Sequence, residues 1–270
     1  MILFPNCKIN LGLYVTGKKP DGFHNLQTLF YPVALHDVLE IITQPDASET
    51  TLSISGMPLE SDPNNSCLKA YGLLKNDFPQ LPPVTIYLHK AIPAGGGLGG
   101  GSADGAFTLL LLNKKYNLQL PEEKLMQYAL QLGSDCPFFI RNQPSYATGR
   151  GEILQPVSLD LSAYKIVLVN PGIHIHTGWA FTQIKLTEPE INWNDLVQQP
   201  VEEWKDGLVN VFEKPIFEKH PEIKNIKDVL YENGAAYASM TGSGATVYGL
   251  FKKSENPQFH FPPHYLVKEC

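Results

Sequence analysis

Hydrophobic and polar residues alternate along the first segment of this 270-residue chain, from residue 6 to residue 16. Because successive side chains of a strand point to opposite faces, one face is apolar and the other carries Lys8, Asn10, Gly12 and Tyr14. The same alternation predicts further strands at residues 26–33, 37–43, 50–55 and 84–89. Apolar residues at helical spacing predict helices at residues 65–78, 103–117 and 121–132. These elements together predict an α+β architecture.

The pattern restarts after the sequence Gly149-Arg150-Gly151, which is typical of a turn. A strand is predicted at residues 165–169, and helices interrupted at Pro221 are predicted between residues 210 and 233. Two more strands, at residues 237–240 and 246–251, enclose a Gly-Ser-Gly turn. We therefore expect two domains, residues 1–150 and 151–270, with the last strand able to return to the first domain.

The composition of the chain limits the classes of protein to which it can belong. A hydrophobic content of 43% is ample for a core, and a net charge of −6 disfavours nonspecific binding of nucleic acid. Four cysteines are scattered without a metal-binding spacing, which is typical of reduced thiols. The N-terminus lacks the features of a signal peptide, and no apolar segment reaches the length of a membrane span. These features predict a cytoplasmic protein without a membrane partner.

Six glycines lie within the seven residues from Gly95 to Gly101, between a predicted strand and a predicted helix. Glycine allows backbone N–H groups to converge closely on an anion, and a helix N-terminus adds partial positive charge. A flexible linker is the alternative, but linkers are not held between a strand and an apolar helix. The run therefore predicts a phosphate-binding loop.

Two well-known phosphate loops do not fit this run. The spacing of Gly95, Gly97 and Gly100 matches a dinucleotide fingerprint, but Pro93 separates the loop from its strand. A P-loop requires lysine at the position that Gly101 occupies. The loop therefore belongs to another kind of nucleotide-binding protein.

Several segments resemble the motifs of the GHMP kinases, a family of small-molecule kinases. The segments are Pro5 to Gly17 with Asp21 to His24, Pro93 to Asp104, Leu132 to Phe138, and Met240 to Val247. They occur in the order that the family shows and span most of the chain. The resemblance implies the two-domain α+β GHMP kinase fold, with the active site in the cleft between the domains.

The resemblance also implies that ATP binds along the glycine run, with Mg²⁺. The implied ATP-binding residues are Pro93, Ala94, Gly95, Gly96, Gly97, Leu98, Gly99, Gly100, Gly101, Ser102 and Ala103, with Lys90 and Asn65 near the base. The hydroxyl of Ser102 is a candidate ligand for phosphate or for the metal. Helix capping explains Asn65 equally well.

Two residues are expected to carry the catalysis. Lys8 alone reads as a solvated lysine on a strand, and Asp135 reads equally as a helix cap or as a working carboxylate. The resemblance matches them to the catalytic lysine and aspartate of the family. Such a pair is physically reasonable, because the ammonium keeps the aspartate ionised while the carboxylate aligns the attacking hydroxyl.

The turn Asp21-Gly22-Phe23-His24 resembles that of members whose substrate is a small alcohol linked to cytidine diphosphate. An aromatic ring beside an imidazole suits cytosine, although a plain β-turn is the alternative from the residues alone. The expected substrate-binding residues are Asn10, Phe23, His24, Thr177 and Phe181. The family has tyrosine where Phe23 stands, so stacking is retained and a phenolic hydroxyl is lost.

Two other functions remain open at this stage. The first is a GHMP kinase for another alcohol, such as mevalonate or homoserine, and the turn at Phe23 and His24 argues against it. The second is a noncatalytic nucleotide-binding regulator, and the presence of both Lys8 and Asp135 argues against it. We expect a monomer or a weak homodimer that binds no nucleic acid.

Overall fold

The computed structural model describes residues 1–58, 64–189 and 193–270. The chain forms two compact units, and each is built from several stretches. The first unit comprises Met1–Cys7, Ala34–Ala94 and Gly99–Gln143, and the second comprises Lys8–Val33, Gly95–Leu98 and Pro144–Cys270. This division by contacts differs from the expected domains 1–150 and 151–270, because an N-terminal hairpin belongs with the second unit. The glycine run itself passes from one unit to the other and back.

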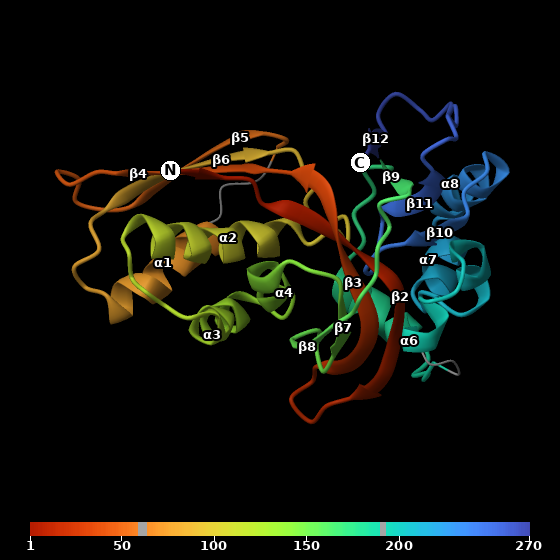
Figure 1. Ribbon diagram of the computed structural model, residues 1–270, viewed down its shortest axis with the longest axis horizontal. Coiled ribbons are helices and arrows are strands. Elements are labelled where there is room, and N and C mark those ends of the chain that lie inside the picture. The colour runs from red at the N-terminus through yellow and green to blue at the C-terminus, as the bar shows by residue number, and fades with distance from the viewer. Residues whose placement is uncertain (59–63, 190–192) are drawn as a thin grey trace. The chain divides into compact units, whose positions relative to one another are not determined.

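The sheet of the first unit has four strands in the order β1-β4-β6-β5 (Figure 1). Their bounds are Ile2–Leu3 for β1, Val38–Thr43 for β4, Thr51–Gly56 for β5 and Val84–Lys90 for β6. Strands β5 and β6 are parallel, and the helix between them makes the crossover that a parallel pair requires. The sequence predicted β4, β5 and β6 to within about a residue at each end.

Four helices lie on one face of this sheet (Figure 1). They are α1 (Ser66–Asp77), α2 (Gly100–Lys115), α3 (Glu122–Leu132) and α4 (Cys136–Arg141). Helix α2 begins three residues before its predicted start, because Gly99 adopts the left-handed conformation with φ of 73° and the helix begins at the next glycine. The end of the glycine run is therefore the first turn of α2.

The second unit contains two further sheets. The first has the order β2-β3-β7-β8, with β2 at Asn6–Lys18, β3 at His24–His36, β7 at Ser145–Thr148 and β8 at Ile153–Pro156. The second has the order β10-β11-β9-β12, with β9 at Tyr164–Asn170, β10 at Tyr237–Met240, β11 at Val247–Lys252 and β12 at Leu266–Glu269. The last strand that the sequence predicted, residues 246–251, is β11, and it pairs with β10 and β9 within the second unit. The additional strand β12 pairs with β9.

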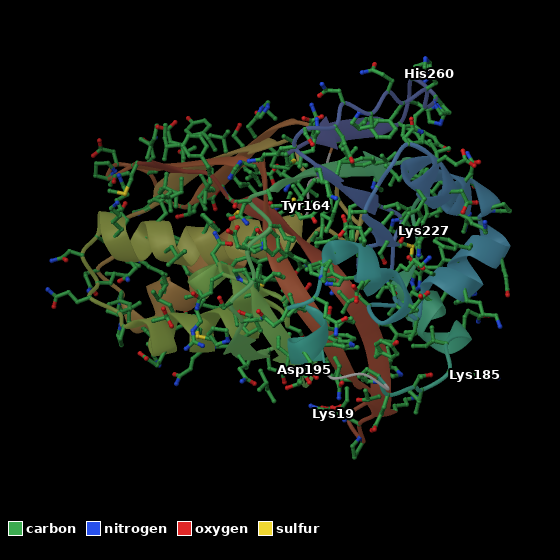
Figure 2. The ribbon with its side chains drawn as sticks, turned by 45° about the vertical axis from the view of Figure 1, so that its right-hand side comes forward. Lys19, Tyr164, Lys185, Asp195, Lys227 and His260 are labelled. Carbon is green, nitrogen blue, oxygen red and sulfur yellow. The ribbon has the colours of Figure 1, made fainter. Side chains whose placement is uncertain are left out.

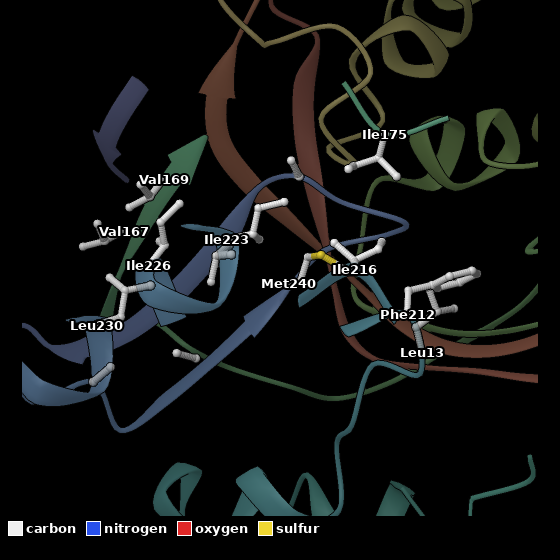
Figure 3. Close-up of a cluster of buried hydrophobic side chains, with 14 of the residues drawn as sticks. Leu13, Val167, Val169, Ile175, Phe212, Ile216, Ile223, Ile226, Leu230 and Met240 are labelled. Carbon is white, nitrogen blue, oxygen red and sulfur yellow. The ribbon is translucent and has the colours of Figure 1, made fainter. Parts of the chain in front are cut away.

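The second unit has five helices in its described part. They are α5 (Thr177–Gln183), α6 (Trp193–Leu196), the 3-10 helix η1 (Val201–Asp206), α7 (Glu213–Lys219) and α8 (Pro221–Glu232). Helix α8 packs against β10 and β11, whereas Trp193 contacts Tyr14 of β2 and Tyr146 of β7. Ile223, Ile226 and Leu230 form one stripe of α8 and join a core with Val167 and Val169 of β9 (Figure 3). This core also contains Met240, so it supports the end of β10 where the Gly-Ser-Gly turn begins.

The side chains of Lys185 and His260 are exposed and lie on the outside of the ribbon (Figure 2). Within the described part of the chain, no helix has both the length and the apolar character needed to cross a membrane.

Candidate active site

Lys8 is buried in β2 although it carries a charge. Its side chain is 4% exposed, and its ammonium donates a hydrogen bond to Asn10 Oδ1 at 2.6 Å. The ammonium also lies 4.9 Å from the centre of the Phe30 ring, where a cation–π contact offsets part of the lost hydration. The alternative of a solvated strand lysine is therefore excluded, and Lys8 is held in one place.

The first part of the glycine run, Gly95 to Leu98, is bound to the second unit. The backbone N–H of Lys8 donates to the carbonyl of Leu98 at 2.9 Å, and the N–H of Thr246 donates to the carbonyl of Gly96 at 3.3 Å. A Cβ on Gly97 would lie 2.1 Å from the carbonyl oxygen of Thr241. Glycine at position 97 is therefore required by close packing against the turn that follows β10.

The second part of the run, Gly99 to Gly101, opens α2. A Cβ on Gly100 would meet Ile92 at 2.8 Å, whereas a Cβ on Gly101 would meet no described atom within 4 Å outside its own helix. Gly101 thus leaves open space beside the first N–H groups of α2, where a phosphate fits. The next residue, Ser102, is half-buried, and its hydroxyl hydrogen-bonds the thiol of Cys136.

Lys90 is buried in an ionic cluster of the first unit. Its ammonium donates to Asp37 Oδ2 and, at 2.6 Å, to Asp104 Oδ2. Asp37 Oδ1 accepts hydrogen bonds from the backbone N–H groups of Ala91 and Ile92 at 2.6 and 2.9 Å. The Asp37–Lys90–Asp104 cluster therefore ties the end of β6 to the β3–β4 corner and to α2.

The cluster contains two carboxylates for one ammonium, and this imbalance affects its protonation. Burial raises the pKa of Asp104 to about 7, the charge of Lys90 opposes this shift, and the charge of Asp37 adds to it. Burial acts to lower the pKa of Lys90, but the two neighbouring carboxylates outweigh it and raise that pKa. Asp104 Oδ1 is also buried without a hydrogen bond, which costs less for a neutral acid than for a carboxylate.

The structure separates the alternatives for Asp135 and Asn65. Asp135 is the residue before α4, but its side chain makes no capping hydrogen bond to that helix. Asn65 does cap α1, because its side-chain oxygen accepts from the N–H of Cys67 at 2.9 Å. Its role in binding the base stays a prediction, as does that of Lys90.

Two residues expected to bind the substrate lie together in the second unit. The rings of His24 and Phe181 are stacked, with centroids 4.5 Å apart and an interplanar angle of 22°. Burial and the nearby charge of Lys18 lower the pKa of His24, so its imidazole is neutral at pH 7. A neutral imidazole has one donor and one acceptor nitrogen for reading a base edge.

Phe23 and Thr177 have different surroundings. Phe23 is 49% exposed, and the guanidinium carbon of Arg150 lies 4.4 Å from the centre of its ring. The hydroxyl of Thr177 lies within hydrogen-bond distance of Ser243 Oγ, at 3.2 Å, beside the Gly-Ser-Gly turn. The sequence interpretation used Arg150 only as part of a domain boundary, and its place between two glycines was the available signal.

The described residues contain no group of three or more His, Cys, Asp or Glu side chains able to hold a metal ion. Ser102 is therefore at most one ligand among others, which agrees with the habit of Mg²⁺ to keep waters and substrate phosphates as ligands.

Comparison with known proteins agrees with this geometry. The family model for the GHMP kinases N terminal domain matches residues 65–143, and the model for the GHMP kinases C terminal domain matches residues 195–259. A 4-diphosphocytidyl-2-C-methyl-D-erythritol kinase of Bacteroides fragilis is 52% identical over 94% of this chain and 93% of its own length. The same kinase of Azobacteroides pseudotrichonymphae is 49% identical over 99% of this chain and 100% of its own length.

Comparison with solved structures indicates the same family. A crystal structure of 4-(cytidine 5'-diphospho)-2C-methyl-D-erythritol kinase matches with a TM-score of 0.80 at 30% identity, covering 93% of this chain and 90% of that one. A homoserine kinase from Cytophaga hutchinsonii has a TM-score of 0.67 at 13% identity, covers 92% of this chain and 85% of its own, and shares the fold alone. With two matching domain models and near-complete relatives at about half identity, the chain belongs to the GHMP kinase family.

Proposed function

We propose that this protein uses ATP to phosphorylate the 2-hydroxyl of 4-diphosphocytidyl-2-C-methyl-D-erythritol, giving the 2-phosphate and ADP in non-mevalonate isoprenoid precursor biosynthesis. The substrate is inferred from relatives of that name that are about 50% identical over nearly the whole chain. The reaction type is supported by one observation above others: Lys8 is buried and fixed beside the glycine run.

In the proposed reaction the substrate hydroxyl oxygen attacks the γ-phosphorus of ATP, and the bond to the β–γ bridging oxygen breaks. Asp135 accepts or orients the hydroxyl proton. Lys8 supplies a fixed positive charge toward the phosphoryl group as negative charge develops. Phosphoryl transfer of this kind depends on positioning and charge more than on covalent chemistry by the protein.

The phosphates of ATP would lie along the glycine run, at the N-terminus of α2. The open space at Gly101 receives them, and the N–H groups of the first turn are the donors. Mg²⁺ bound with ATP would neutralise phosphate charge, and Ser102 is this chain's candidate ligand for it. Asn65 and Lys90 remain the residues proposed near the base.

The cytosine is proposed to bind next to His24 and Phe181. The stacked pair presents an aromatic face and a neutral imidazole edge. The guanidinium of Arg150 covers one face of the Phe23 ring, so we propose that the other face stacks on the base. Thr177 is a further proposed contact. Asn10 was also expected here from the sequence, but its amide is engaged by Lys8 and Thr28.

The test is a coupled assay for ADP release with ATP and a panel of alcohols. The cytidine substrate should be phosphorylated efficiently, and the uridine analogue should react at least about a hundredfold more slowly, because a site built for an amino donor then faces a carbonyl. Methylerythritol phosphate without a nucleotide, mevalonate and homoserine are the other arms. Efficient turnover of mevalonate or homoserine would replace the proposed substrate, and absence of turnover with every alcohol would favour the noncatalytic regulator.

We also propose that the protein acts in the cytoplasm as a monomer or weak homodimer. All four cysteines are free thiols, which suits a reducing compartment. Sedimentation velocity across a range of protein concentrations measures the oligomeric state.

A further inference from the structure

Asn10 is the centre of a buried hydrogen-bond network in the second unit. Its side chain is 2% exposed, and its Oδ1 accepts from Lys8 Nζ at 2.6 Å, Thr241 Oγ1 at 3.1 Å and the N–H of Gly242 at 3.0 Å. An amide oxygen has two lone pairs, which Lys8 Nζ and the N–H of Gly242 already satisfy. The single proton of Thr241 can point to Asn10 Oδ1 or to the carbonyl of Gly97. The oxygen of Asn10 is therefore fully used within the protein.

The orientation of the Asn10 amide is also fixed. Its Nδ2 donates to Thr28 Oγ1 at 2.8 Å, and that hydroxyl donates to the carbonyl of Gly12 at 2.6 Å. Because the Thr28 hydroxyl donates its one proton to the carbonyl of Gly12, it can only accept a hydrogen bond from the amide of Asn10. The amide atom that faces Thr28 is therefore the nitrogen. The amide therefore presents its oxygen to Lys8.

The backbone of Asn10 extends the network. Its N–H donates to Thr241 Oγ1 at 3.0 Å, and its carbonyl accepts from the hydroxyl of Tyr248 at 2.8 Å. Thr241 Oγ1 also lies 3.1 Å from the carbonyl of Gly97 in the glycine run. One residue thus connects the buried lysine, the turn after β10 and the first part of the glycine run.

We propose that Asn10 is a positioning residue for phosphoryl transfer, which fixes the ammonium of Lys8 through its amide oxygen and aligns the glycine run through Thr241. This inference rests on the proposed function and assigns Asn10 a role other than direct substrate binding. Such positioning matters because a displacement of about 1 Å in a catalytic group can lower the rate about a hundredfold.

A double-mutant cycle tests the link to Lys8. Asn10→Ala should lower kcat about hundredfold and change the KM for the cytidine substrate less than about threefold. In the background of Lys8→Met, the same substitution should lower kcat by less than about threefold further, because the group it positions is already absent. Ser239→Ala is the matched control: it removes a buried hydroxyl that bonds Glu213, and its effect should be the same in both backgrounds.

The link to the glycine run is tested with Thr241→Val, which removes the hydroxyl and keeps the shape. The dissociation constant of a nonhydrolysable ATP analogue, measured by titration calorimetry, should rise about tenfold because the loop is less well aligned before binding. Ser239→Ala, two residues earlier on β10, should leave that constant unchanged within about twofold.

If Asn10→Ala does not fold, Thr28→Val gives the same cycle by removing the hydroxyl that holds the amide. The proposal is overturned if the two losses in kcat multiply fully, or if the cytidine KM rises while kcat is retained, which would show direct substrate contact. An inactive wild-type enzyme in the alcohol panel contradicts the proposed function instead, and the ATP analogue titration still tests the loop.

Discussion

Lys8 and Lys90 are both buried, and each lies against one part of the same glycine run. Lys8 is 4% exposed and its backbone bonds Leu98, whereas Lys90 is 3% exposed and its ammonium would be 3.4 Å from a Cβ on Gly100. Their partners differ: Lys90 is paired with two carboxylates that join three elements, and the ammonium of Lys8 bonds an amide oxygen.

This difference shows that burial alone does not identify a catalytic lysine. The charge of Lys90 is balanced inside the fold, so its electric field at a bound phosphate is largely cancelled. The ammonium of Lys8 is held by the amide oxygen of Asn10 at 2.6 Å. The first arrangement suits a structural tie, and the second suits stabilisation of a phosphoryl group during transfer.

The largest expected effects come from removing the charge of Lys8 or that of Lys90. Lys8→Met should lower kcat about a thousandfold while the protein remains folded, because developing charge loses its cation. Lys90→Met should instead destabilise the fold by about 3–5 kcal/mol, because two buried carboxylates remain without a counter-ion. Steady-state kinetics and urea unfolding of both variants measure the two outcomes. A stable but inactive Lys90→Met would show that Lys90 serves catalysis after all.

Asp135 extends the comparison to carboxylates. Asp135→Ala should lower kcat at least about a hundredfold and leave the affinities for the ATP analogue and the cytidine substrate largely intact, because its role lies in handling the hydroxyl proton. Asp37→Ala, which removes a carboxylate that accepts two backbone N–H bonds, should act mainly on stability. Near-normal turnover by Asp135→Ala would remove the catalytic assignment.

The sequence predicted the element types near these residues because their periodicity is local. It did not predict α5, the β7–β8 pair or β12, because the apolar residues of these short segments do not recur at strand or helix spacing. The sequence predicted the start of α2 three residues too late, because glycine has a low helix propensity. The left-handed conformation of Gly99 nevertheless allows the helix to begin at Gly100.

Hydrogen-bond partners that are distant in the sequence could not be predicted from its local patterns. Asp37 and Lys90 are 53 residues apart, and Asn10 and Thr241 are 231 residues apart. Through the family resemblance the sequence assigned Lys8 to catalysis and Lys90 to the surroundings of the base, but it did not show the buried partners of either residue. It did place His24 and Phe181 in one substrate region, and the structure stacks their rings.

The excess carboxylate of the Lys90 cluster predicts a pH effect on stability. The folded-state pKa of Asp104 is about 7, against an ordinary value of 3.8, so its contribution is fully present below pH 3.8 and is lost as the pH rises toward 7. Asp104→Asn removes the titrating group and therefore this loss of stability. As the pH rises from 4 to 7, the free energy of unfolding of the variant should gain about 2–4 kcal/mol relative to that of the wild type. Urea unfolding of both proteins without nucleotide, across that range, measures the difference. Parallel stability curves would mean that Asp104 is ionised throughout.

The smallest expected effect separates the two parts of the glycine run. Gly101→Ala places a methyl group in open space on the first turn of α2, so the fold should be unchanged or stabilised by about 0.5–1 kcal/mol, as helix propensity favours alanine. If phosphate occupies that space, the KM for ATP should rise about tenfold while the KM for the cytidine substrate stays constant.

Gly72→Ala is the matched control, because Gly72 is also helical, in α1, and a Cβ there likewise meets no described atom within 4 Å outside its helix. It should give the same gain in stability with no change in either KM. Gly97→Ala provides the opposite case, since its methyl group would collide with the carbonyl of Thr241, and it should lower stability and ATP affinity together. An unchanged KM for ATP in Gly101→Ala would place the phosphates away from the start of α2, and the role of Lys8 would then have to be tested against the Gly95 to Leu98 part of the run alone.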